Sequence, residues 1–294
     1  MSSRKLTIGT RGSKLAFWQA DWIAGQLEQQ GCETRISVIR TTGDRLTQES
    51  LRQLGAQEGI KGVFTKEIED ALLAGSIDLA VHSLKDLPVR LAPGLALGCI
   101  PQRADARDAL LGKKLGQLKA GDCVGTSSQR RAIQLRSLLP GVVVQDLRGN
   151  IDTRIRKLHK GLFDAIVLAA AGLQRLQLEH EISEILEPEV MVPAIGQGHW
   201  CVSNPGWCRR VRPYLDQLHD SRTAAEVGAE RALLRALGGG CQVPLGGHAT
   251  MTCDKLTLVS VTVSGSGAIL RSQATGALSE AEKLGESVAA DLGS

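Results

Sequence analysis

Aromatic side chains are scarce in this chain of 294 residues, at 3% of the total. A core built without them must depend on the aliphatic side chains that supply most of the 43% hydrophobic content. No apolar run approaches the length of a membrane-spanning helix. The N-terminal residues 1–5 also lack the apolar stretch of a signal peptide. We therefore expect a globular protein of the cytoplasm that does not enter a membrane.

Cysteine pairs and nucleotide-binding motifs are missing as well. The seven cysteines form no CxxC pair, and none stands with histidine at the spacing of zinc ligands. Free thiols in a reducing compartment are the simplest interpretation, and no metal site is predicted. No GxGxxG motif opens the first predicted helix, and no P-loop or serine nucleophile elbow is present. The chain length of 294 residues predicts two or three domains.

The charge balance is mild, with 35 basic and 31 acidic side chains and a net charge of +4. No run of consecutive Lys and Arg residues forms a basic tail. Binding to nucleic acid is therefore not indicated.

Strand and helix patterns alternate along the first two thirds of the chain. A strand over 6–10 precedes a helix over 14–30, and the pattern returns with a strand over 123–125 and a helix over 128–139. Such alternation predicts βαβ units and a mainly parallel sheet. Residues 93–108 show no clear periodicity and are interpreted as a crossover between domains.

The last part of the chain has a different pattern. A helix over 224–237 is followed by strands over 256–263 and 269–275 and by a helix over 279–292. We interpret this part as a small α+β domain.

Arginine side chains follow several predicted strands or stand in the first turns of the helices after them. In open α/β sheets, ligands bind beyond the carboxyl ends of the strands, where helix N-termini also present free N–H groups. Guanidinium groups gathered there favour carboxylate or phosphate ligands. For any single arginine, a solvated surface position is an equally good interpretation. The arginines concerned are Arg11, Arg130, Arg131, Arg148, Arg154 and Arg175.

Two further positions can carry chemistry, and each has a structural alternative. Lys85 and Asp86 follow a buried strand, where a carboxylate can accept N–H protons or stabilise a cation, but they can equally be a surface ion pair. Cys241 follows three glycines that leave its thiol accessible for nucleophilic or covalent chemistry. A small buried hydrophobic role is the slightly favoured alternative for a free cysteine.

Seven segments together resemble one known family, the porphobilinogen deaminases or hydroxymethylbilane synthases. They occur in family order over most of the chain. The segments are IGTRGSKLA at 8–16, KGVFTKEIEDALL at 61–73, DLAVHSLKDLP at 78–88, VGTSSQRRAIQL at 124–135, LRGNIDTRIRKL at 147–158, DAIVLAAAGLQRL at 164–176 and AERALLRALGGGCQVPLGGHA at 229–249.

The resemblance implies an α/β fold with two domains like those of type II periplasmic binding proteins, a cleft between them, and a small α+β C-terminal domain. It assigns residues 1–99 and 197–218 to domain 1 and 104–194 to domain 2. Residues 222–294 become domain 3, which carries the cofactor cysteine.

The resemblance also implies a transferase of tetrapyrrole, porphyrin and heme biosynthesis. Such an enzyme condenses four porphobilinogen molecules into hydroxymethylbilane and releases ammonia at each step. Its primer is a dipyrromethane cofactor, joined here by a thioether to Cys241. The implied partner is the small-molecule substrate alone, with neither nucleic acid nor membrane, and a monomer is expected.

Site residues follow from the matched segments. Asp86 would be catalytic, holding pyrrole N–H groups and stabilising positive charge, with Lys85 beside it. The residues implied in substrate binding are Arg11, Ser13, Arg148, Arg154 and Arg175. Those implied in cofactor binding, besides Cys241, are Ser83, Lys85, Asp86, Thr126, Ser127, Ser128, Arg130, Arg131, Arg148 and Gly149. Lys61 and Phe64 would close a loop over the site.

Residues 199–208 depart from the family pattern. Two tryptophans, two cysteines and a proline stand where the family has small and apolar residues followed by a glutamate. One hypothesis is a local shift of reading frame in the gene, which resequencing the coding DNA would test; the alternative is ordinary divergence. A chain disabled by this segment is therefore one alternative function. A solute-binding protein on the same scaffold is another, but it would need neither the Lys85–Asp86 pair nor Cys241.

Overall fold

The computed structural model describes residues 5–45, 65–206, 208–238 and 244–293. The chain divides into two compact units. The first comprises Met1–Arg103 and His199–Ala224, and the second comprises Ala104–Gly198 and Ala225–Ser294.

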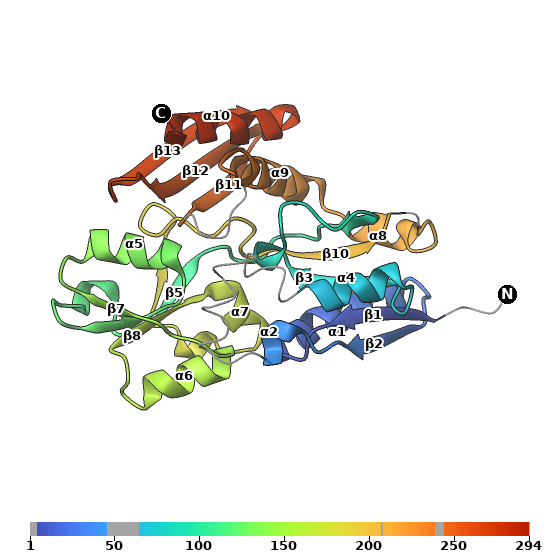
Figure 1. Cartoon of the computed structure of the whole chain (residues 1–294), viewed down its shortest axis with the longest axis horizontal. Helices are drawn as coiled ribbons and strands as arrows, with labels where there is room; N and C mark the ends of the chain where they lie inside the picture. Colours follow the sequence, from blue (N-terminus) through green and yellow to red (C-terminus); the bar gives the residue numbers. More distant parts are fainter. Residues whose placement is uncertain (1–4, 46–64, 207, 239–243, 294) are drawn as a thin grey trace. The chain divides into compact units, whose positions relative to one another are not determined.

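A five-stranded sheet forms the centre of the first unit, in the order β2-β1-β3-β10-β4. β1 pairs in parallel with both β2 and β3, whereas β10 is antiparallel to β3 and to β4. Four strands therefore share one direction and β10 opposes them (Figure 1). The strands are β1 (Leu6–Thr10), β2 (Thr34–Val38), β3 (Leu79–Ser83), β4 (Leu95–Cys99) and β10 (Trp200–Pro205).

Helix α1 (Lys14–Gln29) shows why this unit packs as it does. Ser13 caps its first turn by accepting a hydrogen bond from the N–H of Ala16, and Gly31 follows its end with a φ of 83°. Its buried face, which includes Ile23 and Leu27, packs on the apolar face of the sheet. The other described helices of the unit are α2 (Thr42–Arg45), α4 (Lys66–Leu73), α8 (Arg212–Leu218) and the 3₁₀ turn η2 (Leu84–Asp86).

The second unit repeats the arrangement with the order β7-β6-β8-β5-β9. β6 pairs in parallel with β7 and β8, and β5 is antiparallel to β8 and β9. Buried side chains alternate between the two faces of β5, so both faces carry a core: Leu110 packs on one side and Leu111 on the other. The strands are β5 (Asp108–Gly112), β6 (Cys123–Gly125), β7 (Val143–Gln145), β8 (Ala165–Ala169) and β9 (Glu184–Leu186).

Helices cover both faces of this second sheet. Leu135 of α5 (Gln129–Leu138) joins one core, while Ile155 of α6 (Ile151–His159) and Leu173 of α7 (Ala170–Arg175) join the other. Short 3₁₀ turns, η3 (Leu115–Gln117) and η4 (Glu179–Glu181), complete the connections.

An antiparallel sheet of three strands lies in the C-terminal part, in the order β11-β12-β13. Helix α10 packs on β12 and β13, as Figure 1 shows in red. The elements are α9 (Ser221–Ala236), β11 (Gly246–Thr252), β12 (Lys255–Val263), β13 (Ile269–Ala277), η5 (Leu278–Glu280) and α10 (Ala281–Gly293).

The expected fold class is confirmed: two mainly parallel α/β sheets and a smaller α+β part. The expected crossover over 93–108 contains the boundary between the two units, at Arg103 and Ala104. It is nevertheless not without regular structure, because β4 lies within it and β5 begins at Asp108. Gly98 obscures the β4 pattern. A Cβ there would stand 2.5 Å from Leu215 Cδ1, so a larger residue would require the Leu215 side chain to shift. β11, which opens with two glycines, was not predicted either.

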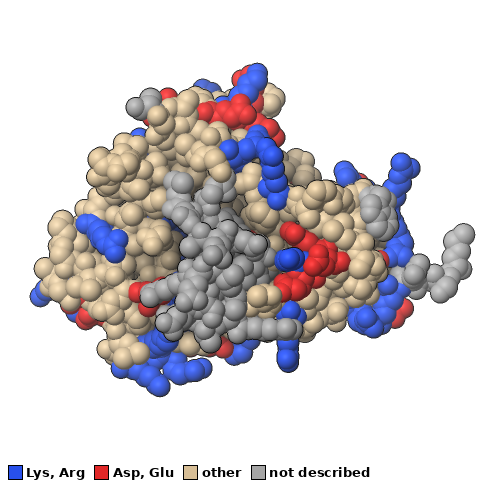
Figure 2. Space-filling view, viewed as in Figure 1, with Lys and Arg blue, Asp and Glu red and all other residues tan. Residues whose placement is uncertain are grey.

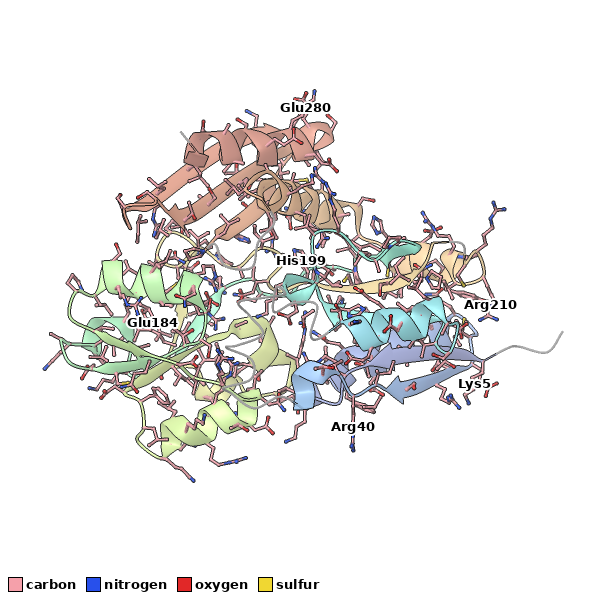
Figure 3. All side chains as sticks on the ribbon, in the orientation of Figure 1. Lys5, Arg40, Glu184, His199, Arg210 and Glu280 are labelled. Atoms are coloured by element: carbon pink, nitrogen blue, oxygen red, sulfur yellow. The ribbon has the colours of Figure 1, made fainter. Side chains whose placement is uncertain are left out.

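Residues 199–208, which depart from the family pattern, supply β10. All six residues of this strand are buried between β3 and β4. His199, labelled in Figure 3, precedes the strand, and its carbonyl oxygen accepts a hydrogen bond from the N–H of Leu84 at 3.1 Å.

Candidate functional site

The first unit places five of the expected site residues after two neighbouring parallel strands. Arg11 and Ser13 follow β1; Ser83 ends β3, and Lys85 and Asp86 lie in η2. Because β1 and β3 run in parallel, these residues follow the same edge of the sheet. Asp86 is exposed, and Lys85 is half-buried. A carboxylate in this position is open to a substrate.

Gln19 supports this edge from helix α1. It is 1% exposed, and its Nε2 donates a hydrogen bond to Ser83 Oγ at 3.2 Å. The bond joins the buried face of α1 to the end of β3. The position of Ser83 is therefore fixed by a residue that the sequence pattern did not single out.

His82 precedes Ser83 and is buried. Its Nε2 lies 2.8 Å from Ser203 Oγ on the neighbouring strand β10. Burial, with a smaller contribution from the positive charge of Arg11, lowers the pKa of His82 to about 4. The imidazole is therefore neutral at pH 7 and joins two strands, which is a structural role.

In the second unit, three hydroxyl residues form the turn between β6 and α5. Ser128 caps α5 by accepting a hydrogen bond from the N–H of Arg131, and Thr126 Oγ1 accepts one from the N–H of Ser128. Ser127 Oγ donates to the carbonyl oxygen of Leu147 at 2.6 Å. The turn is thus held in one shape at the N-terminus of a helix, where anions are favoured.

Arg130 and Arg131 follow in the first turn of α5, and both pair with one carboxylate. Arg130 Nη1 lies 2.7 Å from Asp108 Oδ2, and Arg131 Nη2 lies 2.7 Å from Asp108 Oδ1. The two arginines are 4% and 6% exposed, and Asp108 is 0% exposed. Two buried guanidinium groups therefore share a single negative charge.

The pKa values of Asp108 and Arg130 reflect this excess of positive over negative charge. Burial raises the pKa of Asp108, but attraction by Arg130 and Arg131 outweighs burial and holds it well below its usual value. Burial lowers the pKa of Arg130, which Asp108 only partly offsets. Asp108 is consequently ionised, and a surplus of positive charge remains at the start of α5.

Arg175 adds a third buried guanidinium group from the end of α7. Its Nη2 donates to the carbonyl oxygen of Gly198 at 2.7 Å. Burial lowers the pKa of Arg175 to about 10, so it is still charged at pH 7.

Arg148, Gly149 and Arg154 lie around the N-terminus of α6. Arg148 Nε donates to Asp146 at 2.9 Å, and Arg154 Nε donates to the carbonyl oxygen of Gly149 at 2.7 Å. Gly149 has a φ of 115°, and a Cβ there would lie 2.8 Å from Thr153 Cγ2. Glycine is therefore required at this turn.

Several of these positions lie at one edge of the second sheet. Asp108 pairs with Ala169, the last residue of β8, and so lies at the carboxyl end of that strand. Thr126 follows the parallel neighbour β6. Arg130 and Arg131, which pair with Asp108, therefore lie at the carboxyl end of these strands. Cys241, Lys61 and Phe64 lie outside the described residues.

Asp108 and Gln197 are the two polar residues at this edge that sequence reasoning missed. Gln197 Nε2 donates to Asp108 Oδ1 and to the carbonyl oxygen of Ala106, both at 2.7 Å. A signal for Asp108 exists, because a single acidic residue opens the apolar run 109–111. A charged residue at the start of a buried strand indicates a buried partner of opposite sign.

No group of three or more His, Cys, Asp or Glu side chains among the described residues could hold a metal ion. None of the helices in the described ranges is long and apolar enough to span a membrane. On the face drawn in Figure 2, described Lys and Arg side chains lie scattered among uncharged ones.

Fold and site together define a class of protein. It is an α/β protein with two mixed sheets, whose second sheet carries buried arginines suited to a ligand with several carboxylates.

The family models identify the family. Residues 6–205 match "Porphobilinogen deaminase, dipyromethane cofactor binding domain", and residues 224–293 match "Porphobilinogen deaminase, C-terminal domain". The chain therefore belongs to the porphobilinogen deaminase family and contains the domain that binds the dipyrromethane cofactor.

Curated relatives carry the same name over nearly the whole chain. The porphobilinogen deaminase of Syntrophobacter fumaroxidans is 45% identical over 298 residues, covering 99% of this chain and 95% of that protein. Those of Deinococcus radiodurans and Roseiflexus castenholzii are 45% and 46% identical, each covering 98% of this chain and 95% of the relative.

Solved structures with lower similarity include periplasmic proteins. A periplasmic substrate-binding protein of an ABC transporter from Coxiella burnetii has 14% identity and a TM-score of 0.44, covering 77% of this chain and 96% of that one. An ABC transporter from Parabacteroides distasonis has 15% identity and a TM-score of 0.42, covering 82% of this chain and 81% of that one.

Proposed function

We propose that this chain is an active porphobilinogen deaminase. It condenses four porphobilinogen molecules into hydroxymethylbilane, releasing one ammonia at each step. The observation that carries the proposal is the buried pair Arg130 and Arg131, which shares the single carboxylate of Asp108. Buried charge without a counter-charge is costly, so the surplus is suited to a ligand that brings its own carboxylates. A pyrrole with acetate and propionate side chains is such a ligand.

The cofactor fits the residues that are described. The hydroxyls of Thr126, Ser127 and Ser128 at the start of α5 lie beside the buried arginines in the chain, and Gly149 opens the next helix. From the first unit, the proposed cofactor-binding set includes Ser83, Lys85 and Asp86. When bound through a thioether to Cys241, the dipyrromethane supplies the primer to which the next pyrrole is added.

The proposed roles of the remaining residues follow from their chemistry. Asp86, exposed at the end of β3, accepts hydrogen bonds from pyrrole N–H groups and stabilises the positive charge that develops as ammonia leaves. Lys85 stands beside it. The substrate carboxylates are bound by guanidinium and hydroxyl groups, in which two-pronged contacts fix the orientation of the pyrrole. These residues are Arg11, Ser13, Arg148, Arg154 and Arg175.

Intact mass of the purified protein tests this proposal. We expect an adduct with the mass of a dipyrromethane, lost in Cys241→Ser and kept in Cys253→Ser. Cys253 is an exposed free cysteine and provides the matched control. An active protein with an unmodified Cys241 would rule out the covalent mechanism. An unmodified and inactive protein would instead favour a solute-binding or disabled chain.

The rest of the proposal concerns the domain boundaries, the oligomeric state and the location of the protein. We propose three domains, formed by 1–99 with 197–218, by 104–194 and by 222–294, and the separate family models for 6–205 and 224–293 support the last boundary. We also propose a cytoplasmic monomer whose only partner is its small-molecule substrate. Size-exclusion chromatography with light scattering tests the monomer, since a mass near 31.3 kDa is expected.

A further inference from the structure

Asp108 receives hydrogen bonds or ion pairs from three side chains. Arg130 Nη1 lies 2.7 Å from Oδ2. Arg131 donates to Oδ1 from Nε at 3.1 Å and from Nη2 at 2.7 Å, and Gln197 Nε2 donates to the same oxygen at 2.7 Å. All four residues are less than 9% exposed. The carboxylate is therefore the common centre of the buried polar network at this edge of the second sheet.

Backbone carbonyl groups also accept hydrogen bonds from both arginines. Arg130 Nη1 donates to the carbonyl oxygen of Val192 at 2.6 Å, and Arg131 Nη1 donates to that of Val167 at 2.9 Å. An arginine side chain has many rotamers, and fixing it costs entropy that a ligand must otherwise supply on binding. The contacts with Asp108 and with these carbonyl groups reduce this freedom before any ligand arrives.

We propose that Asp108, supported by Gln197, is a positioning residue that holds Arg130 and Arg131 ready for the carboxylates of the cofactor. The inference rests on the proposed function for the identity of that ligand. Its geometric basis is the place of Asp108 at the start of β5, opposite Ala169 at the carboxyl end of β8. Ligands bind at this edge of such sheets.

Gln197 is fixed by its own surroundings. Its Nε2 also donates to the carbonyl oxygen of Ala106, two residues before Asp108. The N–H of the preceding Gly196 donates to Glu230 Oε2 at 2.6 Å. Gln197 Nε2 therefore bridges the carbonyl oxygen of Ala106 and Asp108 Oδ1, and the backbone just before Gln197 is anchored to Glu230.

Asp164 provides a matched control within the same sheet. It lies just before β8, at the opposite end of that strand from Ala169. It also pairs with a cation, at 2.8 Å from Lys113 Nζ, and accepts a hydrogen bond from the N–H of Cys123. Asp164→Glu is therefore the same chemical change in the same sheet, away from the arginines.

The first experiment compares steady-state kinetics of the holoenzyme variants Asp108→Glu, Gln197→Met and Asp164→Glu. Rates are referred to the fraction of molecules that carries the adduct by intact mass, and thermal midpoints are measured in parallel. Because the arginines hold the covalently attached primer, we expect kcat to fall about tenfold or more in the first two, with KM within about twofold of the parent. Asp164→Glu should keep the parent kcat. A lower thermal midpoint with unchanged kcat per cofactor-bearing molecule would overturn the proposal, because it would show a structural role alone.

The second experiment does not need turnover, so it separates this proposal from the proposed function. In the Cys241→Ser background, citrate serves as the probe carboxylate, and the thermal midpoint is measured with and without it. We expect citrate to raise the midpoint by several degrees in Cys241→Ser and in its Asp164→Glu derivative, and to have little effect in its Asp108→Glu derivative. Equal protection of all three, or of none, would contradict a positioning role. If the parent enzyme is inactive but citrate protects the variants in the expected pattern, only the proposed function is contradicted.

Discussion

Trp200 on β10 stacks on Trp18 of α1, with ring centroids 5.5 Å apart and ring planes inclined by 25°. Trp22 lies one helical turn further along α1, and its ring centroid is 4.6 Å from that of Trp200. Three of the four tryptophans in the chain therefore meet at one place. Trp200 belongs to the segment that departs from the family pattern, whereas Trp18 lies just after a segment that matches it. Strand β10 therefore packs its Trp200 against two tryptophans of α1, in the part of the first unit that follows the family pattern.

Replacing Trp200 tests whether this cluster stabilises the first unit. Trp200 is 6% exposed, so Trp200→Ala leaves a large cavity beside both rings of α1. We expect the free energy of unfolding to fall by about 3–5 kcal/mol. Urea unfolding followed by tryptophan fluorescence measures the change. Phe17→Ala, at an aromatic residue of the same helix that is 46% exposed, should have a much smaller effect. Equal losses in both variants would show that the cluster makes no special contribution.

His82 should make the first unit sensitive to acid. Its pKa in the folded protein is about 4, below the ordinary 6.5, so the unfolded chain binds more protons between these two values. The stabilisation from a neutral His82 is therefore complete above pH 6.5 and is lost as the pH falls to 4. The difference corresponds to about 3 kcal/mol.

Urea unfolding of the parent and of His82→Gln at pH 7 and pH 4.5 measures this effect. The parent should lose more stability than the variant on going to pH 4.5, because glutamine takes up no proton there. His180→Gln is the control, since the side chain of His180 is 70% exposed. The same pH dependence in parent and His82→Gln would assign the acid sensitivity to other groups.

Asp86→Asn should remove most turnover and leave the protein folded. The Asp86 residue is exposed and ends the short turn after β3, so its amide analogue disturbs no core packing. The negative charge that stabilises the developing cation is lost, and such contributions are typically worth 10²–10³-fold in kcat. Steady-state assays, intact mass and thermal midpoint should show a large loss of kcat, an unchanged adduct and an unchanged midpoint. Near-normal turnover would exclude the catalytic role.

The elements that sequence patterns predicted well are those whose apolar residues stand between clear start and stop signals. β1 and α1 agree with prediction because Ser13 caps the helix and Gly31 follows its end. β4 and β11 could not be predicted in this way, since glycines demanded by close packing interrupt their alternation. β10 was not predicted from its own residues, which are atypical; the resemblance only assigned 197–218 to domain 1.

The candidate site could be predicted only in part from the sequence. The position of Arg130 and Arg131 in the first turn of a helix follows from the local pattern. Their shared partner Asp108 lies 23 residues away from Arg131, at the end of the segment that was expected to cross between domains. Local periodicity carries no information on such a pairing, because it depends on which strands become neighbours. Only the folded chain brings Asp108, Gln197 and the arginines together.

Glu230 on α9 is a second buried carboxylate whose loss should be measurable. Its Oε2 accepts a hydrogen bond from the N–H of Gly196 at 2.6 Å, and its Oε1 accepts one from the N–H of Ala249 at 2.9 Å. The residue is 0% exposed. In Glu230→Gln, one of these N–H groups must face an amide NH₂ instead of an oxygen. A buried donor is then left without an acceptor, and a bond to a charged group is lost.

We expect Glu230→Gln to lower the free energy of unfolding by roughly 2–3 kcal/mol, the range for lost hydrogen bonds to charged groups. Urea unfolding measures it, and hydrogen exchange should show faster exchange at the amides of Gly196 and Ala249. Glu282→Gln is the control, because the Glu282 side chain is 68% exposed in a surface ion pair with Arg235 and should leave the unfolding midpoint unchanged. Since Gly196 precedes Gln197, a variant that frees this amide should also loosen the support of Asp108. Glu230→Gln with normal stability and unchanged exchange at Gly196 would show that the carboxylate does not fix this segment.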